Sequence, residues 1–382
     1  MARNPDAIIV GAGPAGLACA AIMKAQGLDV AVLEKADHVG AVWRRHYDRL
    51  HLHTDRKHSG LPGLAMPATY PLYPSRAQVV DYLDRYAARF EIEPVFGAEV
   101  CRIGRDSGVW RTVIAQDKFT VSITAPVVVV ATGIADSPHR PTWPGLETYS
   151  GAIVHSIDYR NPLPFAGQRV LVVGFGNSGG EIVLDLANAG VDVMMAVRSP
   201  VQIIPRDLLG FPIMSWAILY QHLPARLVDV INGPVLRLAL GDFEKLGLRR
   251  AAKGPRQMVE DDGRVPLIDI GTLARIRDGS IKIRGGIDRF TTDSVVFLDG
   301  TTERIGAVIL ATGFRPDLRR LMPDVDGVFD RAGMPRVTGQ ATVASGLYFC
   351  GQITVPTGQL REIGIEAQRI ASSAKAYLTQ GG

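Results

Sequence analysis

Two glycine-rich loops with the same spacing lie about 160 residues apart and constrain the fold more than any other feature. The first loop is Gly11-Ala-Gly13-Pro-Ala-Gly16, and the second is Gly174-Phe-Gly176-Asn-Ser-Gly179. Each loop follows a short apolar run typical of a buried parallel strand and precedes a helical pattern. This combination binds the pyrophosphate of a dinucleotide at the helix N-terminus. One such loop is a weak signal, but two predict two nucleotides held in one chain.

The first unit predicts a site for an adenosine ribose without a 2′-phosphate. We expect a strand over 7–10, a helix that ends near Gln26, and a second strand over 30–33. The second strand ends in Glu34, and a carboxylate at this position accepts from the ribose diol and repels a 2′-phosphate. FAD or NAD fits this pattern. The alternative is a generic glycine turn beside an exposed glutamate.

The second unit differs at the end of its second strand. A strand is expected over 169–173, a helix over 181–189 and a further strand over 191–197. Arg198, followed by Ser199, stands where the first unit has its acid. A guanidinium pairs with phosphate through two parallel hydrogen bonds, so this unit favours NADPH over NADH. A solvated surface arginine is the alternative interpretation.

Each unit is followed by an apolar strand and an Ala-Thr-Gly turn, at 131–133 and 311–313. Small residues at these strand ends let the backbone lie close to a cofactor. The predicted fold class is therefore α/β, with two nested Rossmann-like dinucleotide-binding domains in a glutathione-reductase-like architecture. The expected boundaries are 1–145 and 315–382 for an FAD-binding domain, and 146–314 for an NADPH-binding domain inserted between them.

Composition narrows the class of protein. A chain of 382 residues with 47% hydrophobic residues is long enough for two domains with large cores. The net charge of +4 includes no long basic run, which argues against a nucleic-acid partner. Cys19, Cys101 and Cys350 form no C-x-x-C pair, which argues against a redox-active disulfide and fits a reducing cytosol. The chain enters a strand without a signal-peptide pattern, so we expect a cytoplasmic protein.

Several further segments carry structural expectations. Prolines interrupt the apolar stretch 208–240, so it contains no uninterrupted apolar helix that could span a bilayer, and no integral membrane protein is expected. Core or lid packing is the favoured role for this stretch, and a dimer face or a membrane-surface element are the alternatives. We expect an amphipathic helix over 76–90, turns and short strands over 257–283, and a strand that ends at Gly351-Gln352 before a helix over 361–378. The N-terminus of that last helix would face a flavin; a plain strand–helix unit is the alternative. A homodimer is the ordinary expectation.

Four histidines between His46 and His58 raise the question of a metal site. No cysteine or carboxylate completes a zinc set with them at a familiar spacing, so no metal is predicted. For His53 alone, a structural hydrogen bond and a role beside a flavin both remain open.

The segment from Tyr149 to Arg160 adds a family resemblance. It matches the signature F-x-G-x-x-x-H-x-x-x-[YF]-[KR], with Tyr149 in place of the usual phenylalanine. With the two loops and the two Ala-Thr-Gly turns, the chain resembles the class B flavin-dependent monooxygenases. Tyr159 stands where the Baeyer–Villiger branch has tryptophan, which favours the flavin-containing monooxygenase branch.

Within that branch the chain looks closest to the YUCCA-like group. The resemblance covers nearly the whole chain and is carried by 197–199, 204–206, 266–273 and 40–44, where Ala41 replaces a usual glycine. Members of this group convert indole-3-pyruvate to indole-3-acetate by oxidative decarboxylation. The segment 52–54 is more similar to bacterial relatives, so N- or S-oxygenation stays open beside decarboxylation of a 2-oxo acid.

The resemblance implies the chemistry. NADPH would reduce FAD, molecular oxygen would add to give a C4a-(hydro)peroxyflavin, and this species would oxygenate a small organic substrate. The peroxide anion would attack a carbonyl, whereas its protonated form would transfer oxygen to nitrogen or sulfur. Nearby proton donors therefore matter, and His53 and Asn177 are the candidate catalytic residues. An NADPH oxidase or flavoprotein reductase, and a nucleotide-sensing flavoprotein, are the alternatives.

The candidate cofactor-binding residues come from these motifs. Arg206 is included as a possible phosphate contact, with a surface ion pair as the alternative. The full set is Gly11, Gly13, Ala15, Gly16, Glu34, Lys35, Trp43, Arg44, Thr54, Ala131, Thr132, Gly133, Gly174, Gly176, Asn177, Ser178, Gly179, Arg198, Ser199, Arg206, Ala311, Thr312, Gly313, Gly351 and Gln352.

Overall fold

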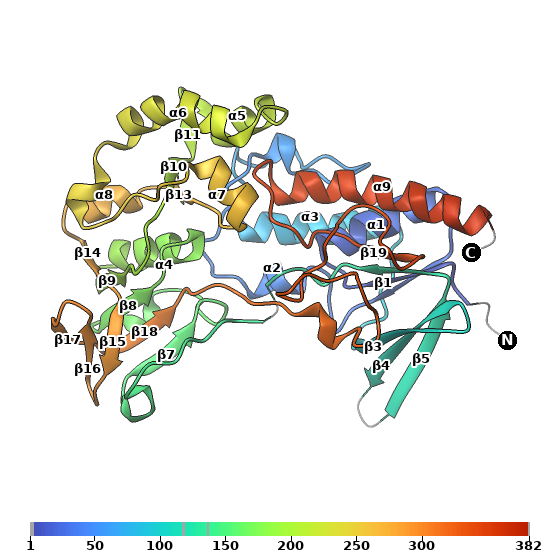
Figure 1. Cartoon of the computed structure of the whole chain (residues 1–382), viewed down its shortest axis with the longest axis horizontal. Helices are drawn as coiled ribbons and strands as arrows, with labels where there is room; N and C mark the ends of the chain where they lie inside the picture. The colour runs from blue at the N-terminus through green and yellow to red at the C-terminus, as the bar shows by residue number, and fades with distance from the viewer. Residues whose placement is uncertain (1–3, 117–118, 136, 381–382) are drawn as a thin grey trace.

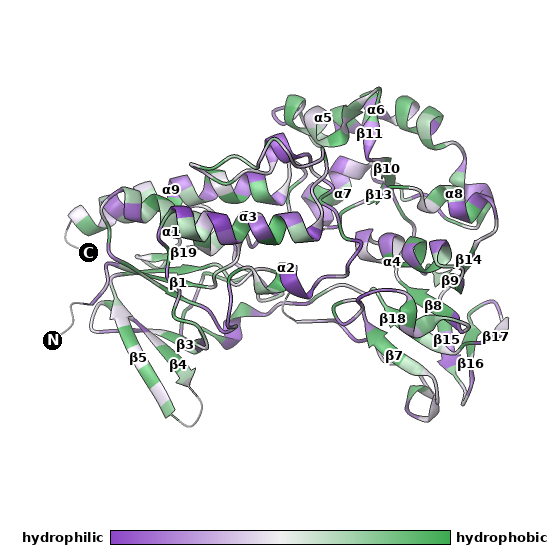
Figure 2. Ribbon diagram, turned by 180° about the vertical axis from the view of Figure 1, so that it is seen from behind, coloured by the Kyte–Doolittle hydropathy of each residue, from purple (hydrophilic) through white to green (hydrophobic). Residues whose placement is uncertain are grey.

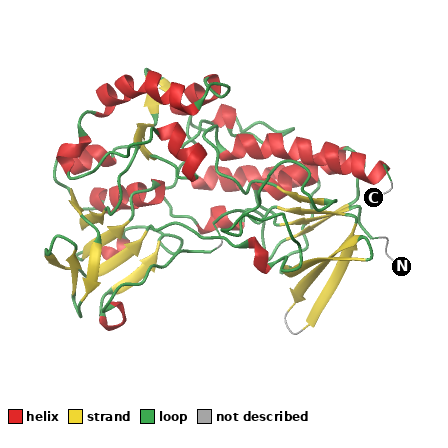
Figure 3. Ribbon diagram, viewed as in Figure 1, coloured by secondary structure: helices red, strands yellow, loops and turns green. Residues whose placement is uncertain are grey.

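Two parallel sheets, one toward each end of an elongated molecule, organise the fold (Figure 1). The computed structural model describes residues 4–116, 119–135 and 137–380. Helices lie on one side of each sheet and additional strands on the other (Figure 3). The molecule is therefore built from two similar three-layer units.

The first sheet has the strand order β19-β6-β1-β2, and all its pairs are parallel. Ile9 and Val129 face the helical layer, whereas Ile8 and Val128 face the antiparallel layer, because side chains alternate along a strand. The sheet consists of β1 (Ala7–Val10), β2 (Val30–Leu33), β6 (Val127–Val130) and β19 (Leu347–Phe349). Its helical layer is α1 (Pro14–Ala25), α3 (Arg76–Arg89) and α9 (Gln359–Thr379), and its antiparallel layer is β3 (Glu99–Asp106), β4 (Val109–Gln116) and β5 (Phe119–Ala125).

The second sheet repeats this plan in the order β14-β9-β8-β18-β7, again with parallel pairs. Its strands are β7 (Ala152–His155), β8 (Arg169–Val173), β9 (Asp192–Ala196), β14 (Ile281–Arg284) and β18 (Ala307–Leu310). One face packs on α4 (Asn177–Asn188) and α8 (Thr272–Arg277), and the other on β15 (Ile287–Phe290) and β16 (Ser294–Phe297), which pairs with β17 (Thr302–Arg304).

The first sheet takes strands from both ends of the chain, whereas every strand of the second lies between residues 152 and 310. The predicted fold class of two nested Rossmann-like units is therefore confirmed. The boundaries at 145 and 315 stay predictions. The two antiparallel layers were not predicted, although each covers one face of a parallel sheet.

A third group of elements lies over the second unit and reaches the first. A Cβ added to Gly358, directly before α9, would lie 3.2 Å from the Met214 methyl group, and Arg361 donates to Gln221 at 3.4 Å. The group comprises β10 (Ile203–Pro205), β11 (Asp207–Leu208), β12 (Phe211–Pro212), α5 (Ile213–Leu219), α6 (Ala225–Leu240), α7 (Pro255–Asp262) and β13 (Leu267–Asp269). It contacts both units, and its role as a lid stays a prediction.

The expectation that the segment 208–240 packs into the core is wrong for the outer side of its helices, which is exposed. Leu219, Val230 and Leu238 are 68%, 73% and 86% exposed, and Figure 2 shows hydrophobic residues along α5 and α6. Only one side of each helix is buried, through Met214, Val228 and a few neighbours. No helix in the described part of the chain is both long and apolar enough to span a bilayer.

The segment 257–283 is another difference from expectation, because it contains α7 and α8 as well as β13 and β14. Pro255 stands in the first turn of α7 and Gly263 ends that helix in the left-handed conformation. Asp269 accepts from the amide of Leu273 at the start of α8. These end signals were present in the sequence, but the helices are too short to show a clear period.

Candidate functional site

The first glycine loop is shaped by close contacts between backbone segments. Gly11 has φ +105°, and a Cβ added there would lie 2.7 Å from the carbonyl oxygen of Ala131. A Cβ on Gly16 would lie 1.8 Å from the carbonyl oxygen of Gly11, so only glycine lets α1 approach β1. A Cβ on Gly13 would meet nothing within 4 Å. The first and third glycines are thus required by the protein, and the second leaves open space for a ligand.

The second loop repeats this geometry. Gly174 has φ +113° and an added Cβ would lie 2.3 Å from the Ala311 carbonyl oxygen, while a Cβ on Gly179 would lie 2.4 Å from that of Gly174. Gly176, like Gly13, has open space. In both units the alanine of an Ala-Thr-Gly turn is therefore what packs on the first glycine.

The helices that follow both loops begin without side-chain caps. Gly13 precedes α1 and Gly176 precedes α4, and neither start has a side-chain hydrogen bond to its amides. The free N–H groups and the helix dipole favour an anion at each position. Both sites therefore fit the pyrophosphate of a dinucleotide.

Asn177 and Ser178 occupy the start of α4 with separate roles. The Asn177 side-chain oxygen accepts from the backbone amide of Ile268 at 2.8 Å, which ties α4 to β13. Its NH₂ group remains as a donor. Ser178 acts on Tyr47, a buried residue outside this loop, and lowers its pKa against the larger effects that raise it.

The acid directly after β2 holds the first loop, and its contact with a ribose stays a prediction. Glu34 is 7% exposed, and its carboxylate accepts from the amides of Ala12 at 2.7 Å and Ala36 at 2.9 Å. Each carboxylate oxygen accepts more than one hydrogen bond, so capacity for a diol remains. Lys35 beside it is exposed.

Arg198 lies one position beyond the residue that matches Glu34, because Val10 pairs with Leu33 in the first unit and Val173 with Ala196 in the second. It is exposed, and its guanidinium makes no hydrogen bond or ion pair with another described residue. The preceding residue is held to β14 through the backbone bond from Val197 to Arg284, at 2.8 Å. Ser199 is partly buried. The geometry leaves the Arg198 guanidinium available to a phosphate.

The segment after Gly40 forms α2 (Ala41–Arg45). The Arg44 guanidinium donates to both carboxylate oxygens of Asp84 on α3, at 2.5 and 2.6 Å. Trp43 packs against the helical core of the first unit. Arg44 thus has a structural partner, and its contact with a cofactor stays a prediction.

The segment after β19 comes back to the first loop. A Cβ on Gly351 would lie 3.3 Å from the Ala15 side chain, and its amide donates to Glu366 of α9 at 2.7 Å. In the orientation that satisfies its hydrogen bonds, the buried Gln352 amide donates to the Gly133 carbonyl at 3.2 Å and accepts from the Gly133 amide at 3.3 Å. The predicted residues at 131–133 and 351–352 are therefore brought together.

The signature segment around β7 has a structural role in this fold. The His155 ring lies 3.2 Å from the Gly313 carbonyl oxygen, and Tyr159 donates to Asp185 of α4 at 2.8 Å. Burial lowers the pKa of His155, so the ring is neutral near pH 7. Thr312 donates to the His139 carbonyl at 2.5 Å. The bonds to Gly313 and from Thr312 hold the second Ala-Thr-Gly turn in place, and the Tyr159 bond ties the segment to α4.

One polar contact joins segments of the two units. The His53 ring nitrogen Nε2 lies 2.5 Å from Glu181 Oε1, and the Glu181 side chain is 2% exposed. Burial, the negative charge of Glu181 and the hydrogen bond to it hold the pKa of Tyr47 well above its usual value. Thr54, next to His53, bonds Ser59 at 2.6 Å. His53 therefore does have a structural hydrogen bond, and it also lines a cavity.

That cavity has a volume of about 340 Å³. Arg206 forms part of its wall, stacked 4.2 Å over the Tyr73 ring, and approaches Asp207 at 3.5 Å. The lining residues are Arg49, His51, His53, Glu181, Arg206 and Ile270. Arg49 and Glu181 were not predicted as site residues. Glu181 could have been recognised from the sequence, because it is a charged residue within the apolar pattern of a helix.

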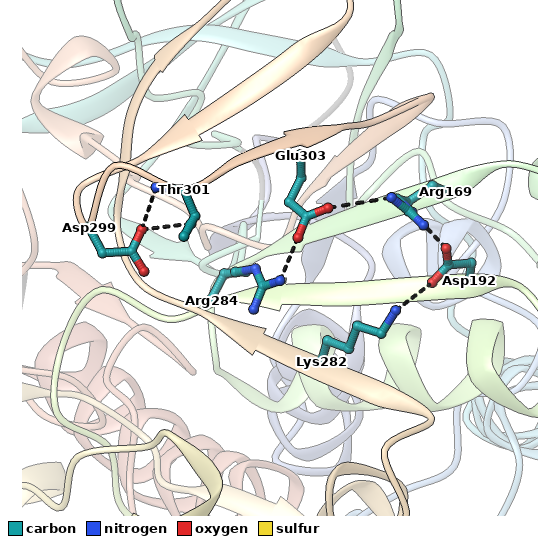
Figure 4. A network of polar contacts seen from close by, with 7 residues as sticks. All are labelled: Arg169, Asp192, Lys282, Arg284, Asp299, Thr301 and Glu303. Carbon is teal, nitrogen blue, oxygen red and sulfur yellow. Dashed lines mark hydrogen bonds and ion pairs between the residues drawn. The ribbon is translucent and has the colours of Figure 1, made fainter.

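A larger cavity of about 760 Å³ lies at the amino ends of β8 and β9, where Arg169 and Asp192 line it. These residues belong to the ion-pair network of Figure 4, in which Arg169 donates to Asp192 at 2.6 Å and to Glu303 at 3.4 Å. The hydrogen bond from Arg169 holds the pKa of Asp192 below its usual value. Ligands of such sheets bind at the carboxyl ends of strands. None of the predicted site residues lines this cavity, so we regard it as structural.

Comparisons with known proteins agree with this geometry. Residues 6–325 match the family described as Flavin-binding monooxygenase-like. The chain is 40% identical to the indole-3-pyruvate monooxygenase YUCCA1 of Oryza sativa subsp. japonica over 337 residues, 87% of this chain and 82% of that protein. The fold is similar to a flavin-containing monooxygenase from Stenotrophomonas maltophilia, with TM-score 0.76, 22% identity and coverage of 98% and 99% of the two chains. It is also similar to an oxidized steroid monooxygenase bound to NADP, with TM-score 0.76, 18% identity and coverage of 97% and 85%.

Proposed function

Because the chain belongs to the flavin-binding monooxygenase-like family, we propose that it oxidatively decarboxylates indole-3-pyruvate or a closely related aromatic 2-oxo acid. The family assignment confirms the predicted class, a flavin-dependent monooxygenase that uses FAD and NADPH to oxygenate a small substrate. The single observation that supports the substrate is the 40% identity to an indole-3-pyruvate monooxygenase over 87% of the chain.

The proposed reaction balances as 2-oxo acid, O₂, NADPH and H⁺ giving the shortened carboxylic acid, CO₂, NADP⁺ and water. The bond between the carboxyl and carbonyl carbons breaks, and one oxygen atom enters the new carboxylate. When bound, FAD supplies electron transfer from NADPH and the activation of oxygen. The protein's part is to orient the reactants and exclude water.

We assign the FAD site to the first unit. The open space at Gly13 and the uncapped start of α1 support a pyrophosphate there, and Glu34 supports an adenosine ribose. The remaining proposed contacts are Gly11, Ala15, Gly16, Lys35, Trp43, Arg44, Thr54, Ala131, Thr132, Gly133, Gly351 and Gln352.

We assign the NADPH site to the second unit. The same open space at Gly176 and the uncapped start of α4 support a second pyrophosphate, and the free guanidinium of Arg198 supports a 2′-phosphate. The remaining proposed contacts are Gly174, Asn177, Ser178, Gly179, Ser199, Ala311, Thr312 and Gly313. Arg206 was predicted with this set, and its place in the cavity wall leads to a different proposal below.

We keep His53 and Asn177 as the proposed catalytic donors. His53 lines the cavity between the two units and is oriented by Glu181. Asn177 has its side-chain oxygen committed to Ile268, so its NH₂ group is the one that can face a ligand.

Product analysis tests the function. The FAD-loaded protein is supplied with NADPH, ¹⁸O₂ and indole-3-pyruvate, with excess catalase present. We expect indole-3-acetate with one ¹⁸O atom, formed in proportion to the NADPH consumed. Catalase is the essential control, because hydrogen peroxide decarboxylates 2-oxo acids without an enzyme. Loss of the product on adding catalase would identify an NADPH oxidase, and conversion of an aryl sulfide but not of the oxo acid would identify an S-oxygenase.

We also propose a cytoplasmic location and a homodimer. All three cysteines are free thiols, which is compatible with a reducing compartment. Light scattering during size-exclusion chromatography measures the mass in solution; twice the chain mass of 41.2 kDa is expected, and a mass near 41 kDa would contradict the dimer.

A further inference from the structure

We propose that the cavity between His53 and α4 binds the carboxylate of the substrate, with Arg49 and Arg206 as its cationic contacts. This inference rests on the proposed function, because a 2-oxo acid brings a carboxylate to the site. It adds two substrate-binding residues, one of which, Arg206, was predicted to contact a nucleotide phosphate.

The position of the cavity suits a substrate. His53 comes from the segment beside Thr54, and a Cβ on Gly358 at the start of α9 would lie 3.2 Å from the Thr54 methyl group. The opposite wall is Glu181, one turn beyond Asn177 on α4. The cavity thus lies between a segment of the proposed FAD unit and the first helix of the proposed NADPH unit. Its volume of about 340 Å³ is within the usual range for small-molecule sites.

The two arginines have unused capacity for an anion. The Arg49 guanidinium makes no hydrogen bond or ion pair with another described residue. Its positive charge lowers the pKa of Asp185, which burial raises. Arg206 stacks on Tyr73, and among the described residues the one polar contact of its guanidinium is with Asp207 at 3.5 Å. The Asp207 carboxylate also accepts from the Tyr73 hydroxyl. Stacking holds the planar guanidinium in one orientation, which suits recognition of a carboxylate.

Glu181 is the one acidic residue in the lining, and its carboxylate already has a hydrogen-bonding partner within the protein. His53 bonds it at 2.5 Å, and the neighbouring Tyr47 is buried with its pKa raised by burial and by Glu181. The lining therefore holds two guanidinium groups, Arg49 and Arg206, and a single carboxylate that already has a partner in His53. A carboxylate is therefore the complementary group, and Ile270 is the apolar part of the lining.

Paired ligands test this site by direct binding. Indole-3-acetate carries the carboxylate and indole-3-acetamide is its neutral counterpart; both are titrated into FAD-loaded protein by calorimetry. We expect R49Q and R206Q each to weaken acetate binding about 10- to 100-fold and to leave amide binding nearly unchanged, because each removes a charge-assisted hydrogen bond. R49K should retain part of the affinity. R85Q is the control, since Arg85 is 62% exposed and pairs with Asp81 on α3.

The outcomes separate this inference from the proposed function. A rise in the KM for NADPH in R49Q and R206Q, with unchanged binding of indole-3-acetate, would place a nucleotide phosphate in the cavity and overturn the inference. Equal losses for acetate and amide would overturn it too. Absence of indole-3-acetate formation by the wild-type protein would instead contradict the proposed function, and the acid-over-amide preference would still test the cavity. Flavin content and thermal unfolding confirm that each variant is folded.

Discussion

At the residue scale, Arg198 is where the two units differ most in chemistry. Glu34 directly follows the second strand of the first unit, and the exposed Arg198 guanidinium has no partner among the described residues. For R198Q we expect kcat/KM with NADPH to fall about 10- to 100-fold and kcat/KM with NADH to change little, because only NADPH carries the 2′-phosphate. Steady-state kinetics with both nucleotides measure this. R304Q, which alters an exposed arginine on β17, is the matched control, and equal losses with NADPH and NADH would contradict the assignment.

A second residue-scale prediction concerns pH and stability. Burial and the nearby positive charges of Arg160, Arg76 and Arg45 lower the pKa of His46 to about 4. The unfolded chain takes up this proton near pH 6.5 and the folded protein only near pH 4, so stability falls as the pH falls through that window.

The variant H46Q isolates this contribution. At pH 5 the wild type should lose about 2 kcal/mol relative to pH 8 from this group, and H46Q should lose that much less. Urea unfolding at the two pH values gives the difference. Identical pH dependence in the two proteins would show that His46 does not titrate in this way.

At the element scale, the two loops distinguish glycines that the backbone requires from glycines that leave room for a ligand. G179A places a Cβ 2.4 Å from the Gly174 carbonyl oxygen and should separate α4 from β8, whereas G176A meets no protein atom. Gly176 has φ −101° and ψ −175°, which alanine adopts without strain.

We therefore expect G176A to keep the thermal stability of the wild type but to bind NADPH at least about tenfold more weakly. The added methyl group would prevent the pyrophosphate from approaching the backbone closely. G179A should lose stability by several kcal/mol or fail to fold. Thermal unfolding and titration with NADP⁺ separate the two effects. Unchanged NADP⁺ affinity in G176A would argue against a pyrophosphate at this loop.

At the scale of the whole molecule, the contact between His53 and Glu181 joins residues 128 positions apart in the chain. Removing one partner of a buried pair leaves the other charge without compensation, which costs more than replacing both. We expect H53L to destabilise the protein by about 2–4 kcal/mol, and the double variant H53L/E181L to recover part of that loss.

Chemical unfolding of the wild type, both single variants and the double variant measures this coupling. Strictly additive losses would mean that the two side chains do not interact across the units. Because the pair also lines the proposed carboxylate site, its integrity should matter for substrate binding as well as for stability.

The sequence by itself determined the elements whose signals are local. The strands β1 and β2 lie where the apolar runs predict them, and α3 lies within one residue of the predicted 76–90 helix. Spacing alone predicted that the loops at Gly11 and Gly174 start two dinucleotide units, because the glycine pattern reflects contacts within a single strand–turn–helix. The nested order followed from the repeated Ala-Thr-Gly turns.

The tertiary structure alone decided which distant residues meet. The pairing of His53 with Glu181, the cavity wall formed by Arg49 and Arg206, and the exposed outer side of α6 depend on how separate segments pack. Periodicity and spacing report a residue's own strand or helix and not its partner across the chain. Short helices such as α7 and α8 escaped prediction for the related reason that their stability comes from packing, which a local pattern does not record.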